Sequence, residues 1–163
     1  MTDFSNAKLR GCWSGEQIAA FLRAATIPLR LSVHDGVGSP WVMSLWFLPE
    51  DDALWCATPG PSKLADYVAR QPQCGFEVAG DTPPYRGVRG KGECSIVPER
   101  GGEMLRRLLD RYAIGPETRL ARGLLGKIES EVAIRIRPTH LTSWDFTERM
   151  KDAVAAGTQP PAT

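Results

Sequence analysis

Apolar and polar residues alternate along much of this chain with the two-residue period of a β-strand. Leu29, Leu31 and Val33 alternate with polar residues, which predicts a half-buried strand over 29–34. Other apolar segments bounded by turn-forming residues predict strands at 41–48, 53–58, 73–79, 85–97, 131–137 and 140–146. Short turns join the first three strands, so we expect them to form a meander. Pro138 is expected to end the strand before it, because proline cannot donate a ladder hydrogen bond.

Apolar residues at helical spacing mark the other predicted elements. Ser14 and Gln17 have the spacing of a helix capping box. The helix that follows them presents one apolar face, made of Ile18, Phe21, Leu22 and Ala25. Ser62 is placed to cap a short second helix that Pro72 ends. A third helix carries the stripe Met104, Leu105, Leu108, Leu109 and Tyr112. A weaker helical pattern covers 117–125.

Six or seven strands with short links and a few inserted helices indicate an antiparallel barrel rather than a Rossmann-type sheet. The glycines at 87, 90 and 92 are typical of bends where a strand curves around a barrel. We therefore predict a mainly β fold with short helices (α+β). Its expected parts are an N-terminal helical extension over 1–26, a barrel domain over 27–147 and a disordered tail over 148–163.

Composition and charge exclude several classes of function. Twenty Lys and Arg against nineteen Asp and Glu leave a net charge of +1, which indicates no general nucleic-acid or membrane partner. A neutral total can still hide a local basic patch. No secretory signal or membrane span is evident. The four cysteines are widely spaced and only two histidines are present, which argues against a metal site. We expect reduced cysteines, three of them inside strands, in a cytoplasmic protein.

The sequence offers little catalytic machinery of its own. It has no G-x-S-x-G, H-E-x-x-H or P-loop motif, so no catalytic residue is assigned. The strongest candidate site is the segment Thr58-Pro-Gly-Pro-Ser62-Lys63. There a strand end, a turn and a helix start aim N–H groups, two hydroxyls and an ammonium at one point, which suits a phosphate. The alternative is that Ser62 only caps its helix and Lys63 is solvated.

Large aromatic residues form a second candidate set. Trp41, Trp46, Trp55 and Trp144 lie in predicted strands. Such residues commonly belong to a core, but a planar cofactor also needs apolar walls with a few polar groups to orient it. Both interpretations stay open on these residues alone.

Seven segments follow one another in a recognisable order: Pro40–Phe47, Ala53–Thr58, Ser62-Lys63, Pro72–Val78, Tyr85–Glu93, Glu131–Pro138 and Thr142–Asp145. This order, over about residues 20–147, resembles the pyridoxamine 5'-phosphate oxidase-like family of split β-barrel flavoproteins. The resemblance implies an antiparallel split β-barrel that holds FMN at the interface of a homodimer. It implies cofactor contacts from Met43, Ser44, Leu45, Trp46, Ala57, Thr58, Ser62, Lys63, Arg86, Val88, Arg89 and Trp144. Within this set, 43–46 would flank the isoalloxazine, and Ala57, Thr58, Ser62 and Lys63 would hold the phosphate.

This chain also departs from the family pattern. True pyridoxamine-phosphate oxidases carry an arginine and a lysine on the second strand, where this chain has Trp41 and Trp46, and a glutamine in place of Gly87. The resemblance therefore implies an FMN-dependent oxidoreductase that reduces a small organic acceptor with a nicotinamide donor, and not a vitamin B6 oxidase. Because a flavin carries out hydride transfer itself, the missing acid–base set is consistent with this function.

The family leaves other functions open. One is a non-catalytic protein that stores or senses a flavin or haem, with His140 or His34 as a haem ligand. Another is a deazaflavin-dependent reductase. A deazaflavin has a longer phosphate-linked tail, whose binding would require a more basic groove than the nearly neutral net charge of this chain indicates. The last is a family member whose site is empty.

Overall fold

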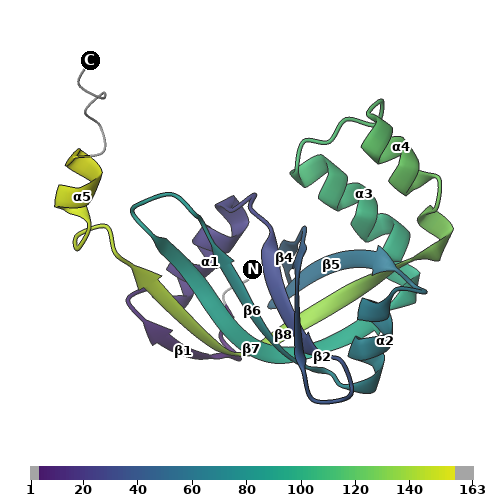
Figure 1. Cartoon of the computed structure of the whole chain (residues 1–163), viewed down its shortest axis with the longest axis horizontal. Helices are drawn as coiled ribbons and strands as arrows, with labels where there is room; N and C mark the ends of the chain where they lie inside the picture. The colour runs from purple at the N-terminus through teal and green to yellow at the C-terminus, as the bar shows by residue number, and fades with distance from the viewer. Residues whose placement is uncertain (1–3, 157–163) are drawn as a thin grey trace.

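The computed structural model describes residues 4–156, and eight strands within this range form one sheet. The strands are β1 (Lys8–Gly11), β2 (Leu29–His34), β3 (Pro40–Leu45), β4 (Leu48–Glu50), β5 (Ala53–Pro59), β6 (Gln73–Ala79), β7 (Arg86–Val97) and β8 (Glu131–Asp145). The helices are α1 (Gly15–Ala24), α2 (Lys63–Arg70), α3 (Gly101–Arg111), α4 (Arg119–Leu125) and α5 (Lys151–Ala156). Two short 3₁₀ turns, Pro98–Arg100 and Ile128–Ser130, precede α3 and β8. Figure 1 shows this arrangement.

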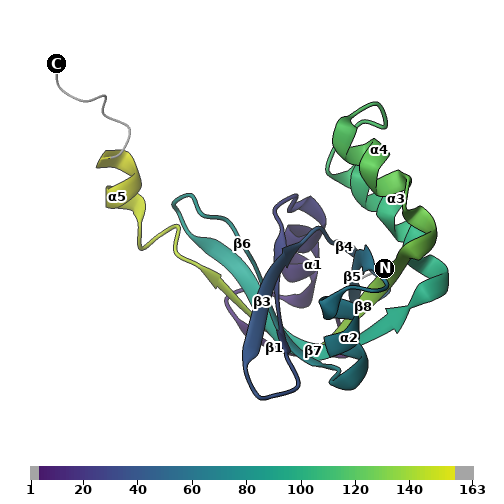
Figure 2. The same cartoon turned by 45° about the vertical axis from the view of Figure 1, so that its right-hand side comes forward.

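The strand order is β3-β2-β6-β7-β8-β5-β4, all antiparallel, with β1 added parallel to β8. Strands β3 and β4 are neighbours in the chain but form opposite edges of the sheet. Two residues separate them, so Leu45 and Leu48 lie within about 11 Å of each other at full extension. The sheet must therefore curl until its two edges approach without pairing. This open, curled sheet is the predicted split β-barrel (Figures 1 and 2).

Two strand predictions were wrong for the same topological reason. The segment 41–48 is two strands rather than one, because the chain crosses from one sheet edge to the other at residues 46–47. The expected meander of three strands does not form either. Strand β3 pairs with β2, whereas β5 pairs with β4 and β8.

Pro138 does not end a strand, since β8 runs unbroken from Glu131 to Asp145. The register places Pro138 opposite Gly92 and His140 opposite Lys91, which leaves Thr139 as the extra residue of a β-bulge. A Cβ at position 92 would overlap the carbonyl group of Arg137, so only glycine fits the partner strand here. The bulge accommodates the proline that would otherwise remove a ladder hydrogen bond.

The core lies between the curled sheet and the helices α1 to α4, with Leu64 and Val68 of α2 in the main apolar cluster. Helix α1 begins with the predicted capping box at Ser14 and Gln17, and buries Ile18 and Leu22 in the main apolar cluster. Helix α3 packs Met104 and other apolar residues against β5 and β8, and α4 extends this second layer through Ala121. Three cysteines, Cys56, Cys74 and Cys94, are buried in strands, Cys12 is exposed, and all four are free thiols.

The two ends of the chain differ from their predicted description in one respect each. The N-terminal segment contains β1 in addition to the helix. This strand was not predicted because its four residues, of mixed polarity, are too few to show a strand pattern. The segment 148–163 was predicted to be disordered. Residues 151–156 within it form α5, and residues 157–163 lie outside the described range.

Candidate functional site

The predicted phosphate segment connects β5 to α2. Thr58 is buried at the end of β5, and its hydroxyl lies 3.1 Å from that of Ser62. The Ser62 hydroxyl also accepts a hydrogen bond from the Ala65 N–H at 3.1 Å, so it caps α2. The Lys63 side chain is exposed, and its Nζ lies 5.6 Å from the centre of the Trp41 ring. The segment thus forms a satisfied helix cap beside one exposed cation, at the positive end of the α2 dipole.

An apolar recess of about 240 Å³ lies between the sheet and the helices α3 and α4. Four of its lining residues, Ser44, Leu45, Trp46 and Ala57, were predicted as cofactor contacts. The other lining residues are Pro28, Pro59, Leu105, Leu108, Leu124 and Glu131. The Trp46 ring stacks on Tyr112 with centroids 5.2 Å apart, which fixes the ring at the wall of the recess. The structure therefore brings these four predicted residues together.

Glu131 is a site residue that the sequence pattern did not indicate. It is only 7 % exposed, and its carboxyl group has no hydrogen-bond or ion-pair partner among the described residues. Burial raises the pKa of Glu131 above the ordinary value for a glutamate. Gly101, the first residue of α3, lies so close to the Glu131 carbonyl oxygen that a Cβ would overlap it. The alternation of the predicted strand 131–137 placed Glu131 among its solvent-facing polar residues. No pattern in the sequence indicated that α3 would cover this residue.

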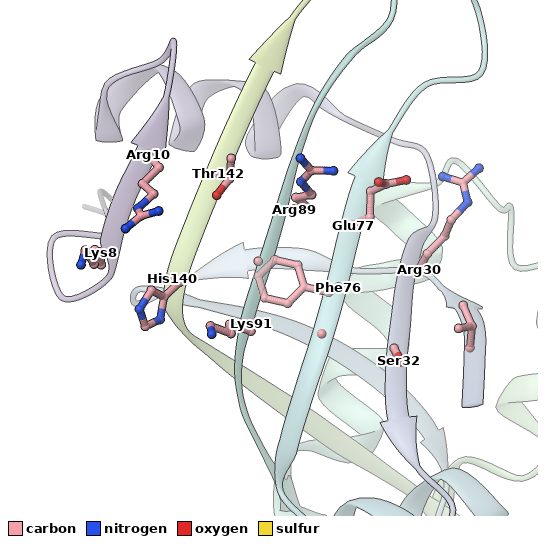
Figure 3. Close-up of a pocket in the computed structure, with 13 residues that line it drawn as sticks. Lys8, Arg10, Arg30, Ser32, Phe76, Glu77, Arg89, Lys91, His140 and Thr142 are labelled. Carbon is pink, nitrogen blue, oxygen red and sulfur yellow. The ribbon is translucent and has the colours of Figure 1, made fainter. Parts of the chain in front are cut away.

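A larger groove, of about 720 Å³, lies on the outer face of the sheet (Figure 3). Its lining residues come from six neighbouring strands, β1, β8, β7, β6, β2 and β3: Lys8, Arg10, Arg30, Ser32, Val42, Gly75, Phe76, Glu77, Arg89, Gly90, Lys91, His140 and Thr142. The strand register arranges most of them in two rows across the sheet. One row is Arg30, Glu77, Arg89, Thr142 and Arg10, and the next is Ser32, Gly75, Lys91, His140 and Lys8.

The groove is strongly cationic. Arg30 forms an ion pair with Asp81 at 3.0 Å. Lys8, Arg10, Arg89 and Lys91 have no ion-pair partner among the residues that the structure describes, and Glu77 is the only acidic residue in the lining. Strands in a sheet are about 4.8 Å apart, so cations two strands apart in one row are about 10 Å apart at their backbones. A groove of this kind can bind an anionic group of a ligand.

The groove and the recess adjoin along β3. Val42 lines the groove and Ser44 lines the recess. Residues two positions apart in a strand project from the same face, so Val42 and Ser44 lie on one side of this edge strand.

The remaining predicted residues lie outside the recess, and of these only Arg89 lines the groove. Met43 packs half-buried against the main core, and Val88 is fully buried within it. Arg86 lines a separate hollow near residues 80–84, and Arg89 lies over the Trp144 ring at 5.3 Å. Residues 86 and 144 belong to the ends of β7 and β8 next to α5, far from α2 in both views (Figures 1 and 2). A single copy of the chain does not gather all twelve residues at one point.

No metal centre is formed by the described residues, which contain no group of three or more His, Cys, Asp and Glu side chains placed to hold an ion. His140 is exposed in the groove, with Nδ1 3.2 Å from the Thr139 hydroxyl. Within residues 4–156, no helix has the length and apolar character needed to cross a membrane.

Comparison with known proteins gave structural relatives only. No protein-family model and no curated protein matches the chain. A conserved hypothetical protein from Mycobacterium tuberculosis is 25% identical, with a TM-score of 0.70 and coverage of 93% of this chain and 92% of that one. An F420 reductase is also 25% identical, with a TM-score of 0.63 and coverage of 74% and 92%. A protein from Listeria innocua described as a pyridoxamine 5'-phosphate oxidase is 17% identical, with a TM-score of 0.61 and coverage of 78% and 95%, and supports the fold alone.

Proposed function

We propose that this chain, a split β-barrel of the pyridoxamine 5'-phosphate oxidase-like family, is a reductase that uses a deazaflavin as its redox cofactor. The observation that supports this proposal is the cationic groove that adjoins the apolar recess along β3. A deazaflavin combines an apolar ring system with a long phosphate-linked tail, and the two hollows match these two parts. When bound, the cofactor supplies hydride transfer, so the protein itself needs only to bind and orient.

The charge distribution supplies the basic groove that a deazaflavin tail requires and that the net charge did not indicate. The net charge of +1 gave no sign of a basic groove, yet this groove holds four cations that have no ion-pair partner among the described residues. The similarity to an F420 reductase, at 25% identity, supports the same cofactor class. In this proposal the ring occupies the recess beside Trp46, and the acidic tail extends over Arg89 and Lys91. Exposed charges are screened by salt, so affinity is expected to fall as the ionic strength rises.

FMN is the second candidate, and Lys63 is the observation that favours it. The lysine stands at the start of α2 over the Trp41 ring, where a single phosphate would meet an ammonium and the positive end of a helix. FMN has no tail to reach the far side of the groove. The two cofactors therefore differ in their expected dependence on Lys91.

A binding experiment separates the two candidates. The purified chain is titrated with FMN and with the deazaflavin F420, and binding is followed by cofactor fluorescence. The double variant Arg10→Ala/Lys91→Ala should weaken F420 binding by about 2- to 30-fold, from two exposed contacts of about 0.2–1 kcal/mol each. The matched control Arg119→Ala/Lys127→Ala removes two exposed cations near α4 and should have no effect. Tight FMN binding that both double variants leave unchanged would instead support FMN, and uptake of neither cofactor would refute the proposal.

Turnover is tested separately. The loaded protein should reduce small organic acceptors in a cofactor-dependent reaction. Cofactor binding without turnover across a panel of acceptors would support a storage or sensing protein, and a Soret band on addition of haem would favour the haem branch of that alternative.

We also propose that the protein is a homodimer whose second copy completes the site. Arg86 and Trp144 belong to the ends of β7 and β8 next to α5, which lie far from α2 in both views (Figures 1 and 2), so they can share a ligand with the start of α2 only across an interface. Light scattering should give twice the 17.9 kDa mass of the chain. A monomer that binds the cofactor with full affinity would contradict this arrangement.

A further inference from the structure

The recess contains one group that the proposed function has not used. Glu131 is the only ionisable side chain in its lining, and only 7 % of the residue is exposed. Its carboxyl group has no partner among the described residues. The carboxyl oxygens are not among the fully buried side-chain atoms without a hydrogen-bond partner, so they reach the surface of the recess, where a bound group can meet them. A ligand in the recess is the partner that the fold leaves room for.

The surroundings of Glu131 determine its protonation state. Leu45 from β3, Ala57 from β5, Leu105 from α3 and Leu124 from α4 face the recess, and none of the other lining residues is charged or titratable. With no cation to stabilise the carboxylate, burial raises the pKa of the group. The carboxyl group therefore keeps its proton to a higher pH than an exposed glutamate does.

We propose that Glu131, in its protonated form, binds the cyclic imide edge of the ring system that occupies the recess. A neutral carboxylic acid has one O–H donor and one carbonyl acceptor side by side. An imide edge presents the complementary pair, a carbonyl oxygen next to an N–H. The two groups form two parallel hydrogen bonds without transferring any charge into the apolar recess. Flavins and deazaflavins both carry such an edge, so the inference rests on the proposed function but not on the choice between them.

Lumiflavin is the probe that tests this contact, because it has the ring and the imide but no phosphate. Binding to the purified chain is measured by titration calorimetry at several pH values. Wild-type affinity should fall as the pH rises through the pKa of Glu131, since the carboxylate loses the O–H donor. Glu131→Gln retains a donor and an acceptor and should bind without this pH dependence. Glu131→Leu and an N3-methylated lumiflavin on the wild type should each bind at least about tenfold more weakly, as expected for a lost buried hydrogen bond.

The outcomes separate this proposal from the proposed function. If F420 or FMN binds while lumiflavin is indifferent to Glu131→Leu and to N3-methylation, the Glu131 contact is refuted and the reductase proposal stands. If lumiflavin binding depends on Glu131 but no phosphate-bearing cofactor is taken up, the contact stands and the reductase proposal falls. Thermal unfolding of Glu131→Leu checks that the variant is folded. The N3-methylated probe tests the contact on the wild type even where the variant does not fold.

Discussion

Replacement of Tyr112 by phenylalanine should destabilise the fold at the point where the chain crosses between the sheet edges. The Tyr112 hydroxyl donates to the Ile27 carbonyl oxygen at 3.0 Å and accepts from the Phe47 N–H at 3.3 Å. Phe47 is fully buried and lies in the two-residue link between β3 and β4. Both hydrogen bonds are partly buried, so water replaces the lost hydroxyl only in part. The phenylalanine ring still stacks on Trp46, so the variant tests the hydroxyl group alone.

The expected cost follows from the backbone groups that lose their partner. A buried donor left unsatisfied costs about 1–3 kcal/mol, whereas a satisfied neutral hydrogen bond contributes only about 1 kcal/mol net. The 3.3 Å contact is long, so we expect about 2 kcal/mol for the pair. In a domain of this size each kcal/mol lowers the melting temperature by about 2–4 °C, which gives a decrease of about 4–8 °C.

Urea unfolding followed by tryptophan fluorescence measures this cost. Tyr67→Phe is the matched control, because it removes the same atom from a half-buried tyrosine that packs edge-on against Trp41 at 5.2 Å. No hydrogen bond of the Tyr67 hydroxyl is present among the described residues. The control should change the free energy of unfolding by less than about 0.5 kcal/mol. Equal effects of the two variants would refute the role assigned to the Tyr112 hydroxyl.

Three further predictions concern other parts of the molecule. Ser14→Ala should lower the free energy of unfolding by about 0.5–2 kcal/mol, since it removes the hydroxyl that caps α1, and urea unfolding checks this. In a thiol titration Cys12 should react first and the other three cysteines only on unfolding, because they are buried and burial raises the pKa of Cys56. Glu131→Gln should gain stability over wild type as the pH rises. The unfolded glutamate ionises at its ordinary pKa and the folded one only at a raised pKa, so wild-type stability falls between the two, which melting curves at acidic and neutral pH will test.

Local patterns carried much of the fold prediction. Alternation predicted β2, apolar segments bounded by turns predicted β5, β6 and the first half of β8, all close to their observed bounds, and the capping box at Ser14 is formed as predicted. These features are determined by residues that are close in the sequence. The errors arose where contacts between residues far apart in the sequence determine the structure. Trp46 and Phe47 are as apolar as the residues before them, yet they leave the sheet because its two edges approach there. Pro138 stays in a strand because Gly92 on β7 leaves room for a bulge.

The candidate site was predictable only where one segment supplied it. The residues 44–46 were expected to contact a cofactor and do line one recess, and Ser62 caps its helix as its spacing indicated. The cations of the groove come from β1, β7 and the neighbouring strands, and only the strand order places them together. In a single sequence each appears as an ordinary solvent-facing residue of an amphipathic strand.

The arrangement of these cations is itself an argument for a ligand. Lys8 and Lys91 lie on either side of His140 in one row, two strands apart, with no carboxylate opposite either of them. The chain has nineteen acidic residues available to balance twenty basic ones, yet Glu77 alone enters this lining. Such a concentration of one sign is typical of sites where binding, rather than stability, determines the residues. Glu131 gives a second argument of this kind, because it lies at the wall of an apolar recess with no protein partner among the described residues, and a ligand with a matching edge would supply one.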